Sequence, residues 1–450
     1  MLAYLKRVIK SRDFPIYSII TIAYLILSAR FFYFIYKYTA NILFWDQWDI
    51  VNDILHKNLI PLLFTQHSEH RIGVGLVITK ILESFSKWDN RVESLTIGLI
   101  ILFASFFALL LKKRLTEKLE ATDVVIPFLF LGLYQWESMT WGFQIAFVLP
   151  LLFLFISLYL FTLKNSLWRN ILLLILVFLS TYSSLHGIFL GGITGLFFFL
   201  GFLTEKERAK KIRNLIFSFA SVLIAASYRI NYTPATFLGA KNFDVIALSK
   251  YIILEISSFI GFVPSSTYAN VLKLLVVSLL LLVIPTIALV SFVWLGYSAL
   301  KNNLVVKYFP IFSLFIFSAL FAASTAYGRL GLGYGGAASS RYTTFMIPLY
   351  LAIYLTITLL LSNHLKRLLV PFLIILFVFF SNQGAYINYV RVTERRDGLN
   401  RWKTCYLKKE DVKICNKGAS YLVFPENRSE FLKLRLDELE KNKVNLFSSD

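Results

Sequence analysis

Two aspartates directly follow the first apolar stretch of the chain. Asp46 and Asp49 belong to the hexapeptide Phe-Trp-Asp-Gln-Trp-Asp. If this piece is helical, residues three apart share one face, so the two carboxylates lie together. A carboxylate beside a membrane can take the proton from an acceptor hydroxyl that attacks an activated carbon, and partial burial between tryptophans raises its pKa for that task. The residues alone leave a second interpretation open, a polar helix end flanked by interfacial tryptophans.

A denser polar cluster follows in the sequence Gln-His-Ser-Glu-His-Arg, which ends at Arg71. His67, Glu69 and His70 are all possible metal ligands, but their spacing matches no strong zinc signature, so a divalent metal is unsupported and we assign none. His70 and Arg71 are better suited to binding an anionic group. Alternatively, the cluster only closes a loop through salt bridges, with Ser68 capping the helix that follows.

The third cluster is a segment at residues 327–342 that contains five glycines. Glycine allows the backbone to approach a ligand closely. Arg329 and Arg341 have the forked donors that clamp a phosphate or pyrophosphate, and the absence of a P-loop pattern argues against a nucleotide site. The alternative is a flexible loop whose arginines bind lipid head groups. Further candidates for the same site are Glu137, Arg229 and Tyr342.

The composition indicates that these clusters belong to a membrane protein. The chain has 450 residues, of which 57% are hydrophobic and 16% charged. Repeated apolar runs of about 20 residues predict transmembrane helices, because backbone polar groups must be paired within lipid. The net charge of +20 does not indicate nucleic-acid binding, since the basic residues lie mostly in short loops between apolar runs.

The distribution of basic residues predicts about eleven membrane helices with a cytoplasmic N-terminus. The first apolar run is not followed by a cleavage site, so we expect an uncleaved helix. A long exported loop at residues 37–93 carries two amphipathic segments, 50–63 and 72–85, that suit helices at the membrane surface. The predicted fold is therefore all-α, with a polytopic domain at residues 1–386 and an exported tail at 387–450.

This topology places the polar clusters on one side of the membrane. The third and fourth predicted helices flank residues 134–141 on the same exported side. Charged residues beside a bilayer are costly unless they serve a function, so clustering on one face predicts a single site that faces away from the cytoplasm.

The chain has two cysteines, Cys405 and Cys415, and both lie in the predicted exported tail. Exported cysteine pairs commonly form disulfides, so we expect a bridge that closes a short loop. Two unpaired thiols are the alternative.

The membrane part, from about residue 14 to residue 386, resembles the GT-C superfamily of membrane glycosyltransferases. Those proteins have many membrane helices, a long first exported loop with amphipathic helices, and an acidic residue just after the first helix. The resemblance implies that Asp46 or Asp49 is this acidic residue, acting as base or contacting the acceptor. It implies a polyprenyl-phosphate sugar as donor and an inverting transfer to a surface glycan such as O-antigen, a glycolipid or a protein. The implied phosphate contacts are His70, Arg71, Arg329 and Arg341.

The resemblance rests on topology more than on a motif. The first loop carries Asp-Gln-Trp-Asp rather than the adjacent Asp-Glu of the protein mannosyltransferases, which leaves the sugar and the choice of base open. A flippase for lipid-linked glycans is one alternative, although the predicted spans lack the charged path that transport needs. A polysaccharide polymerase or ligase is another. The expected location is a bacterial inner membrane, with the site and the C-terminus in the periplasm.

Overall fold

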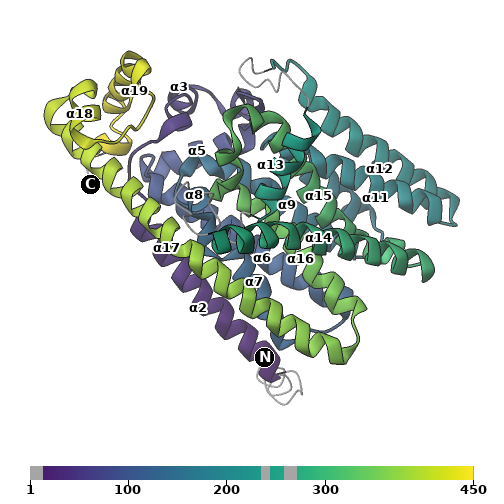
Figure 1. Ribbon diagram of the computed structural model, residues 1–450. Coiled ribbons are helices and arrows are strands. Elements are labelled where there is room, and N and C mark those ends of the chain that lie inside the picture. Colours follow the sequence, from purple (N-terminus) through teal and green to yellow (C-terminus); the bar gives the residue numbers. More distant parts are fainter. Residues whose placement is uncertain (1–13, 235–243, 258–270, 449–450) are drawn as a thin grey trace.

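The computed structural model describes residues 14–234, 244–257 and 271–448, and nearly all of them are helical (Figure 1). The basic N-terminus used to orient the chain lies outside this part. The bundle consists of α2 (Phe14–Tyr38), α6 (Asn90–Thr116), α9 (Ile145–Phe161), α10 (Leu167–Thr181), α11 (Ile188–Thr204), α12 (Arg208–Ala226), α13 (Val245–Ser257), α14 (Val271–Lys301), α15 (Val305–Arg329), α16 (Ser340–Leu360) and α17 (Asn363–Lys409).

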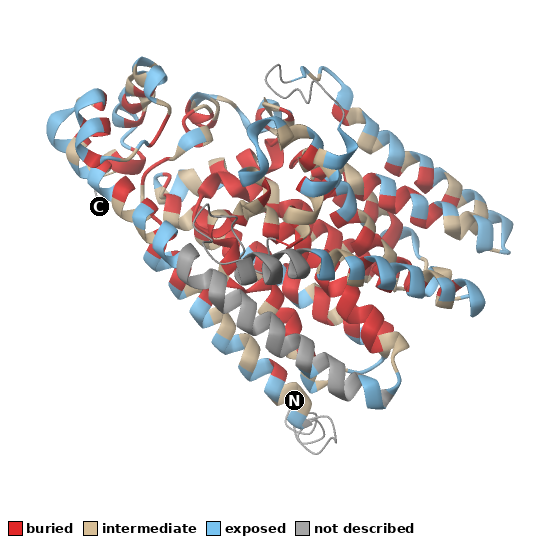
Figure 2. Ribbon diagram, in the orientation of Figure 1, coloured by how far each residue is buried: buried red, intermediate tan, exposed pale blue. Residues whose placement is uncertain are grey.

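Several of these helices are long and apolar enough to cross a membrane. Within the described residues there are seven such stretches: Pro15–Tyr38, Asn90–Thr116, Gly142–Phe161, Leu185–Thr204, Leu282–Lys301, Val305–Leu332 and Ser340–Leu360. Large apolar side chains remain exposed on α2, α11, α12 and α14 (Figure 2). Apolar surface of this kind is costly in water but compatible with lipid. The chain is therefore an all-α protein of the membrane type.

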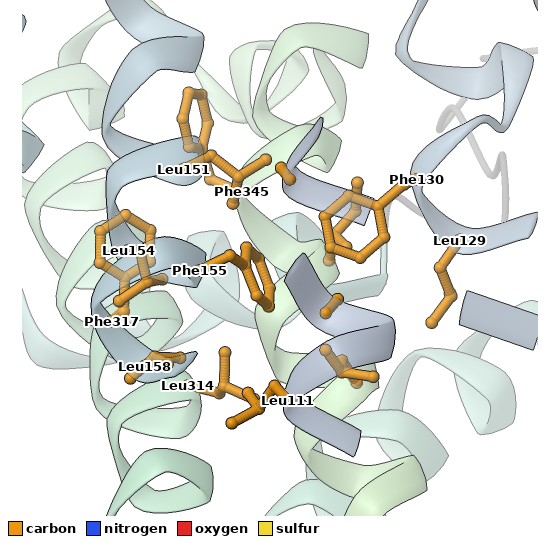
Figure 3. Packing of buried hydrophobic residues seen from close by; sticks show 14 of the residues in the cluster. Leu111, Leu129, Phe130, Leu151, Leu154, Phe155, Leu158, Leu314, Phe317 and Phe345 are labelled. Atoms are coloured by element: carbon orange, nitrogen blue, oxygen red, sulfur yellow. The ribbon is translucent and has the colours of Figure 1, made fainter. Parts of the chain in front are cut away.

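The interior of the bundle is packed from apolar side chains of α6, α7, α9, α15 and α16 (Figure 3). Phe155 of α9 packs against Phe130 at a ring-centroid distance of 5.0 Å. Phe317 of α15 and Leu154 of α9 are fully buried. Because lipid tails are as apolar as these side chains, close packing rather than water exclusion holds such helices together.

The third predicted helix is broken rather than continuous. Residues 121–139 form four short pieces: a 3₁₀ turn η2 (Ala121–Val124), α7 (Val125–Phe130), a second 3₁₀ turn η3 (Leu133–Gln135) and α8 (Trp136–Met139). Gly132 lies at the break, where a Cβ would approach the Tyr134 ring to 2.0 Å. Irregular backbone at membrane depth needs partners within the protein, and here Gln135 donates to the Gly132 carbonyl at 3.3 Å.

This broken segment runs the length of α16. At one end the Tyr354 hydroxyl donates to Asp123 at 2.6 Å, and at the other Glu137 accepts from Ser340 at 3.0 Å. Asp123 is also paired with Lys112 at 2.7 Å, and both side chains are almost completely buried. Lys112 lies near the end of α6, so this ion pair anchors the broken segment to α6.

The loop at residues 37–93 contains helices at both predicted amphipathic segments, but the first segment is divided into α3 (Val51–His56) and α4 (Leu59–Leu63), while the second forms α5 (Gly73–Ser86). Between α4 and α5 the chain forms an antiparallel hairpin, β1 (Gln66–His67) with β2 (His70–Arg71), which the all-α prediction did not include. Ser68 lies in its turn with φ 51°. The suggestion that Ser68 caps the next helix is wrong, because Ile72 holds the N-cap position of α5.

The C-terminal tail folds onto this loop. α17 is 47 residues long, so the domain boundary proposed at residue 386 falls inside a continuous helix. It is followed by α18 (Val412–Ala419), the 3₁₀ turn η10 (Glu426–Arg428), α19 (Ser429–Lys441) and the 3₁₀ turn η11 (Asn445–Phe447). In Figure 1 the yellow helix α19 lies beside α3, and α19 and the first loop share buried residues of one apolar cluster.

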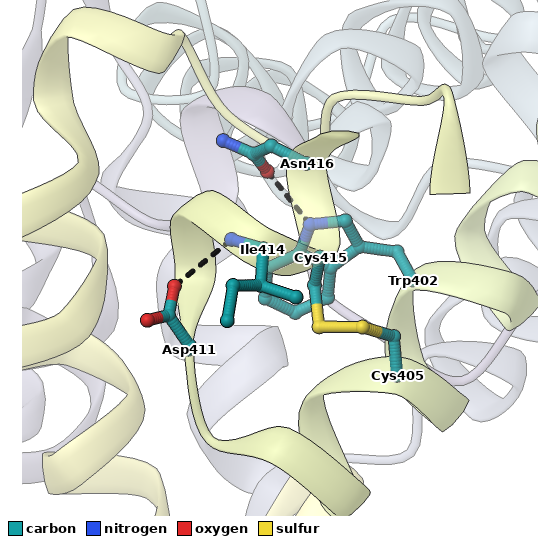
Figure 4. Close-up of a disulfide and its surroundings, with 6 residues drawn as sticks. All are labelled: Trp402, Cys405, Asp411, Ile414, Cys415 and Asn416. Carbon is teal, nitrogen blue, oxygen red and sulfur yellow. Dashed lines mark hydrogen bonds between the residues drawn. A yellow bond between two sulfur atoms is a disulfide. The ribbon is translucent and has the colours of Figure 1, made fainter. Parts of the chain in front are cut away.

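A disulfide joins Cys405 of α17 to Cys415 of α18 (Figure 4). Next to it, the Trp402 indole donates to Asn416 at 2.7 Å. Cys415 and Trp402 are both fully buried. The disulfide and this hydrogen bond therefore hold α18 against the end of α17.

Candidate functional site

A cavity of about 1050 Å³ lies where the hairpin meets the ends of α9, α11, α12, α15 and α16. It is lined by polar residues on the hairpin side and by apolar residues further into the bundle. Eight of the residues singled out from the sequence line it: Asp46, His67, Glu69, His70, Arg229, Arg329, Arg341 and Tyr342. Three other predicted site residues do not line the cavity, although each contacts an element that does: Asp49, Arg71 and Glu137.

Asp46 is positioned by its neighbour in the 3₁₀ turn η1 (Trp45–Gln47). The buried Gln47 amide donates to Asn90 at 3.1 Å and to Glu93 at 3.0 Å, both on α6. The turn is therefore tied to the start of a membrane helix. Burial raises the pKa of the Asp46 carboxyl, and the nearby charges of His67 and Arg341 only partly offset it. A raised carboxyl pKa suits a general base.

Asp46 and Asp49 are close together, as their spacing predicted, and His67 joins them. One ligand atom from each of the three lies within 4.8 Å of the others. Two carboxylates and an imidazole are a possible ligand set for a divalent cation. Asp49, however, already has a cationic partner, because its carboxylate accepts from the Arg428 guanidinium of the tail at 2.9 Å. We therefore assign no metal to this cluster.

Glu69 forms the centre of an ionic group at the hairpin. Its carboxylate accepts from Arg329 at the end of α15 and lies 3.2 Å from the His70 Nε2. The His70 Nδ1 accepts the Leu185 amide hydrogen at 3.2 Å, which assigns the proton to Nε2. Burial raises the pKa of Glu69, but the His70 hydrogen bond and the Arg329 charge outweigh it and lower the pKa to about 2. Glu69 is therefore an anion that joins the hairpin to α15.

Arg71 faces away from the cavity. Its guanidinium donates to the carbonyl oxygens of Tyr228 and Phe64, each at 2.9 Å, and to that of Ile230. All three acceptors are backbone groups. Arg71 holds the hairpin against the end of α12, and its donors are not directed at a bound anion.

Glu137 caps α16 instead of lining the cavity. Its carboxylate accepts from the Ser339 hydroxyl at 2.7 Å, the Ser340 hydroxyl at 3.0 Å and the Arg341 amide at 3.2 Å. A carboxylate is favourable at a helix N-terminus. Glu137 thereby fixes the helix end that carries Arg341.

Among the described residues, the guanidinium groups of two arginines in the cavity form no ion pair with a carboxylate. The Arg341 guanidinium packs over the Trp141 and Tyr342 rings, and its Nε is buried without a hydrogen-bond partner in that part of the chain. Arg229 is exposed and packs over the Tyr232 ring at 5.5 Å. With Arg329 they place three guanidinium groups around one space, an arrangement suited to a phosphate.

The sequence did not identify the apolar half of the cavity. It is formed by α11, α12 and α15, and three of its apolar lining residues, Leu196, Val222 and Leu320, are 42–50% exposed. Such residues resemble any lipid-facing position, so no sequence signal marks them. His186 also lines the cavity, and its ring lies 4.4 Å from that of Phe345, with a hydrogen bond to the Phe147 carbonyl.

Comparison with family models, with curated proteins and with solved structures gives no significant match to this chain.

Proposed function

We propose that this protein is an inverting membrane glycosyltransferase that moves a sugar from a polyprenyl-phosphate donor to an acceptor hydroxyl. The observation that carries the proposal is the composition of the single cavity described above. A carboxylate with a raised pKa and three guanidinium groups lie at its polar end. Its apolar end reaches residues exposed on the lipid-facing surface. A lipid-linked, negatively charged donor needs both halves.

Asp46 is the better candidate for the base. It lines the cavity, whereas Asp49 is held by Arg428 outside the lining. As the acceptor oxygen attacks the anomeric carbon, the bond between that carbon and the phosphate oxygen breaks, and the acceptor proton passes to the Asp46 carboxylate. The bonding electrons leave with the lipid phosphate, whose charge Arg329 and Arg341 stabilise. Attack opposite to the leaving group inverts the anomeric configuration.

A transferase outside the cytoplasm requires a donor that crosses the membrane, and a lipid-linked sugar does so. We place the cavity and the tail on the periplasmic side of a bacterial inner membrane. Beside the seven apolar stretches, four further segments cross the membrane in this proposal: the broken segment, α10, α12 and α17. Seven and four give eleven crossings, with a cytoplasmic N-terminus and a periplasmic C-terminus. The acceptor is a surface glycan, a glycolipid or a protein.

The test is a comparison of surface glycans by mass in strains that carry the wild type, a deletion, or Asp46→Asn. We expect the deletion and Asp46→Asn to lose the same sugar residue at normal protein level. Asp53→Asn is a matched control, because Asp53 lies in the same loop but pairs with Lys57 away from the cavity. Unchanged glycans in the Asp46→Asn strain would contradict the assignment of the base. Intact lipid-linked precursor accumulating inside the cell after deletion would instead indicate a flippase.

A further inference from the structure

A second group of arginines lies at the opposite end of α12 from the cavity. Arg169 is at the start of α10, and Arg213 is in the first turns of α12. Arg169 is only 8% exposed. The Nε and Nη2 atoms of Arg213 are buried and have no hydrogen-bond partner within the described part of the chain. Buried donors without partners are rare in native proteins and require an explanation.

The hydrogen-bond partners of Arg169 are all neutral. Arg169 donates to Asn170 at 2.9 and 3.0 Å, to Asn165 at 3.2 Å and to the Leu163 carbonyl at 2.8 Å. Asn165 in turn donates to Asn214, the residue after Arg213, at 3.3 Å, and so links the two arginine positions. Across residues 14–234, 244–257 and 271–448, neither guanidinium forms an ion pair with a carboxylate. A negative group from outside the chain would balance the two positive charges and satisfy the unpartnered donors of Arg213.

The surroundings indicate what kind of anion can reach this place. Trp168 is 80% exposed. Ile212 and Ile216 are also exposed, and their spacing of four residues puts them on one side of α12. A tryptophan at the end of an apolar helix is typical of the level at which lipid head groups lie. Lys210, one turn from Arg213, is exposed but already paired with Glu207 at 2.5 Å, so the unpartnered charge on this turn is that of Arg213. The accessible anion at that level is a phosphate group.

We infer that Arg169 and Arg213 form a phosphate-binding site at the end of the bundle opposite the cavity. The guanidiniums supply forked, charged donors, which are suited to phosphate oxygens. The ligand is the phosphate of an anionic phospholipid or a soluble phosphate of the same chemistry. This inference is independent of the glycosyltransferase proposal, because none of its residues line the cavity.

The test measures thermal unfolding of the purified full-length protein in detergent with three additions: phosphatidylglycerol, phosphatidylcholine or inorganic phosphate. The expected result is a rise in Tm with phosphatidylglycerol that phosphatidylcholine does not reproduce. We expect Arg213→Gln to weaken the apparent affinity about fivefold. An equal, Arg213-dependent rise with inorganic phosphate would support the site and identify a soluble ligand.

Two variants keep the test decisive. Lys210→Gln removes an exposed charge from the same helix turn and should respond like the wild type. Arg213→Lys keeps the charge but loses the fork, and should respond between the wild type and Arg213→Gln. The inference is overturned if phosphatidylglycerol raises the Tm of the wild type and Arg213→Gln alike, or if neither phosphatidylglycerol nor phosphate raises the Tm of the wild type more than phosphatidylcholine does.

Discussion

Asp46 and Asp49 illustrate how one contact from a distant part of the chain separates two similar residues. The short spacing correctly suggested that the carboxylates lie together, and it gave no reason to prefer either. The distinction comes from Arg428, which pairs with Asp49 and not with Asp46. Arg428 is 379 residues away from Asp49 in the sequence. No local pattern encodes such a contact, so the choice of base was open until the tail was placed.

The ion pair between Arg428 and Asp49 predicts a shift of the pH profile. In the proposed reaction Asp46 is a base only above its pKa, so we expect activity to fall on the acid side. In Arg428→Ala the unpaired Asp49 charge raises the pKa of Asp46 further, and the acid limb of kcat/KM moves to higher pH. Adding Asp49→Asn removes that charge and should return the limb to the wild-type position or below it.

Arg435→Ala is the matched control for this measurement, because Arg435 packs over the same Phe431 ring as Arg428 and has no ion pair with Asp49. A structural role of Arg428 alone would lower activity at every pH and leave the limb in place. The double variant would then show no recovery.

Arg341 is the residue whose loss should most affect the leaving group. Arg341→Ala is expected to lower kcat by about 10²–10³-fold, as seen when a group that stabilises developing charge is removed. Arg341→Lys should recover part of the loss, because the charge remains without the fork. The measurement is the single-turnover rate, with Arg229→Ala, an exposed cation, as the comparison. Equal effects of both alanine variants would argue against a direct role for Arg341.

Among the elements, the hairpin is the piece that most depends on charge. Glu69 joins it to α15 through Arg329, while Arg71 joins it to the end of α12. Strands of only two residues are too short to show a periodic pattern, so nothing in the sequence indicated a strand there. The dense run of polar residues was visible, but its conformation was not.

Glu69 makes the stability of this element pH-dependent. Its pKa is lowered from 4.5 to about 2 in the folded protein. The carboxylate therefore contributes stability that is complete above about pH 4.5 and lost as the pH falls toward 2. Glu69→Gln should lower the free energy of unfolding by about 1–3 kcal/mol at neutral pH. Thermal unfolding between pH 7 and pH 3 should show a steeper decline for the wild type than for Glu69→Gln, and parallel declines would contradict the assignment.

The disulfide gives a prediction for the tail. Replacing both cysteines by serine should destabilise the tail by about 2–4 kcal/mol, since the unfolded chain gains freedom. Hydrogen exchange should then rise in α18 while the membrane helices are unaffected. Exchange in α18 that equals that of the wild type would show that the buried Trp402 and Asn416 hold the helix without the bridge.

The helices themselves were largely predictable, because long apolar runs have few other solutions in a membrane. The broken segment was not, since Pro127 and Gly132 are single residues within an apolar run, and some of the groups that hold it in place, such as Tyr354 and Lys112, come from other helices. The length of α17 was missed for a related reason. The change from apolar to charged residues near 386 marks a change of surroundings, and the helix continues through it.

At the scale of the molecule, the one-sided distribution of polar clusters was the most useful sequence signal. Eight of the residues it selected meet in one cavity although they come from four separate regions of the chain. The sequence could not show that the cavity continues into an apolar half. That half is made of side chains from α11, α12 and α15 whose types are the same as those of any lipid-facing surface.

A helix of 47 residues is about 70 Å long, more than twice the thickness of the hydrocarbon layer. In the proposed topology α17 crosses the membrane and, even when tilted, extends well beyond it, and the end that carries Cys405 is linked to the helices that contact the first loop. It then forms a strut between the membrane and the elements that hold Asp46 and Asp49. A change in bilayer thickness would be transmitted along this strut and alter the height of the two carboxylates above the lipid.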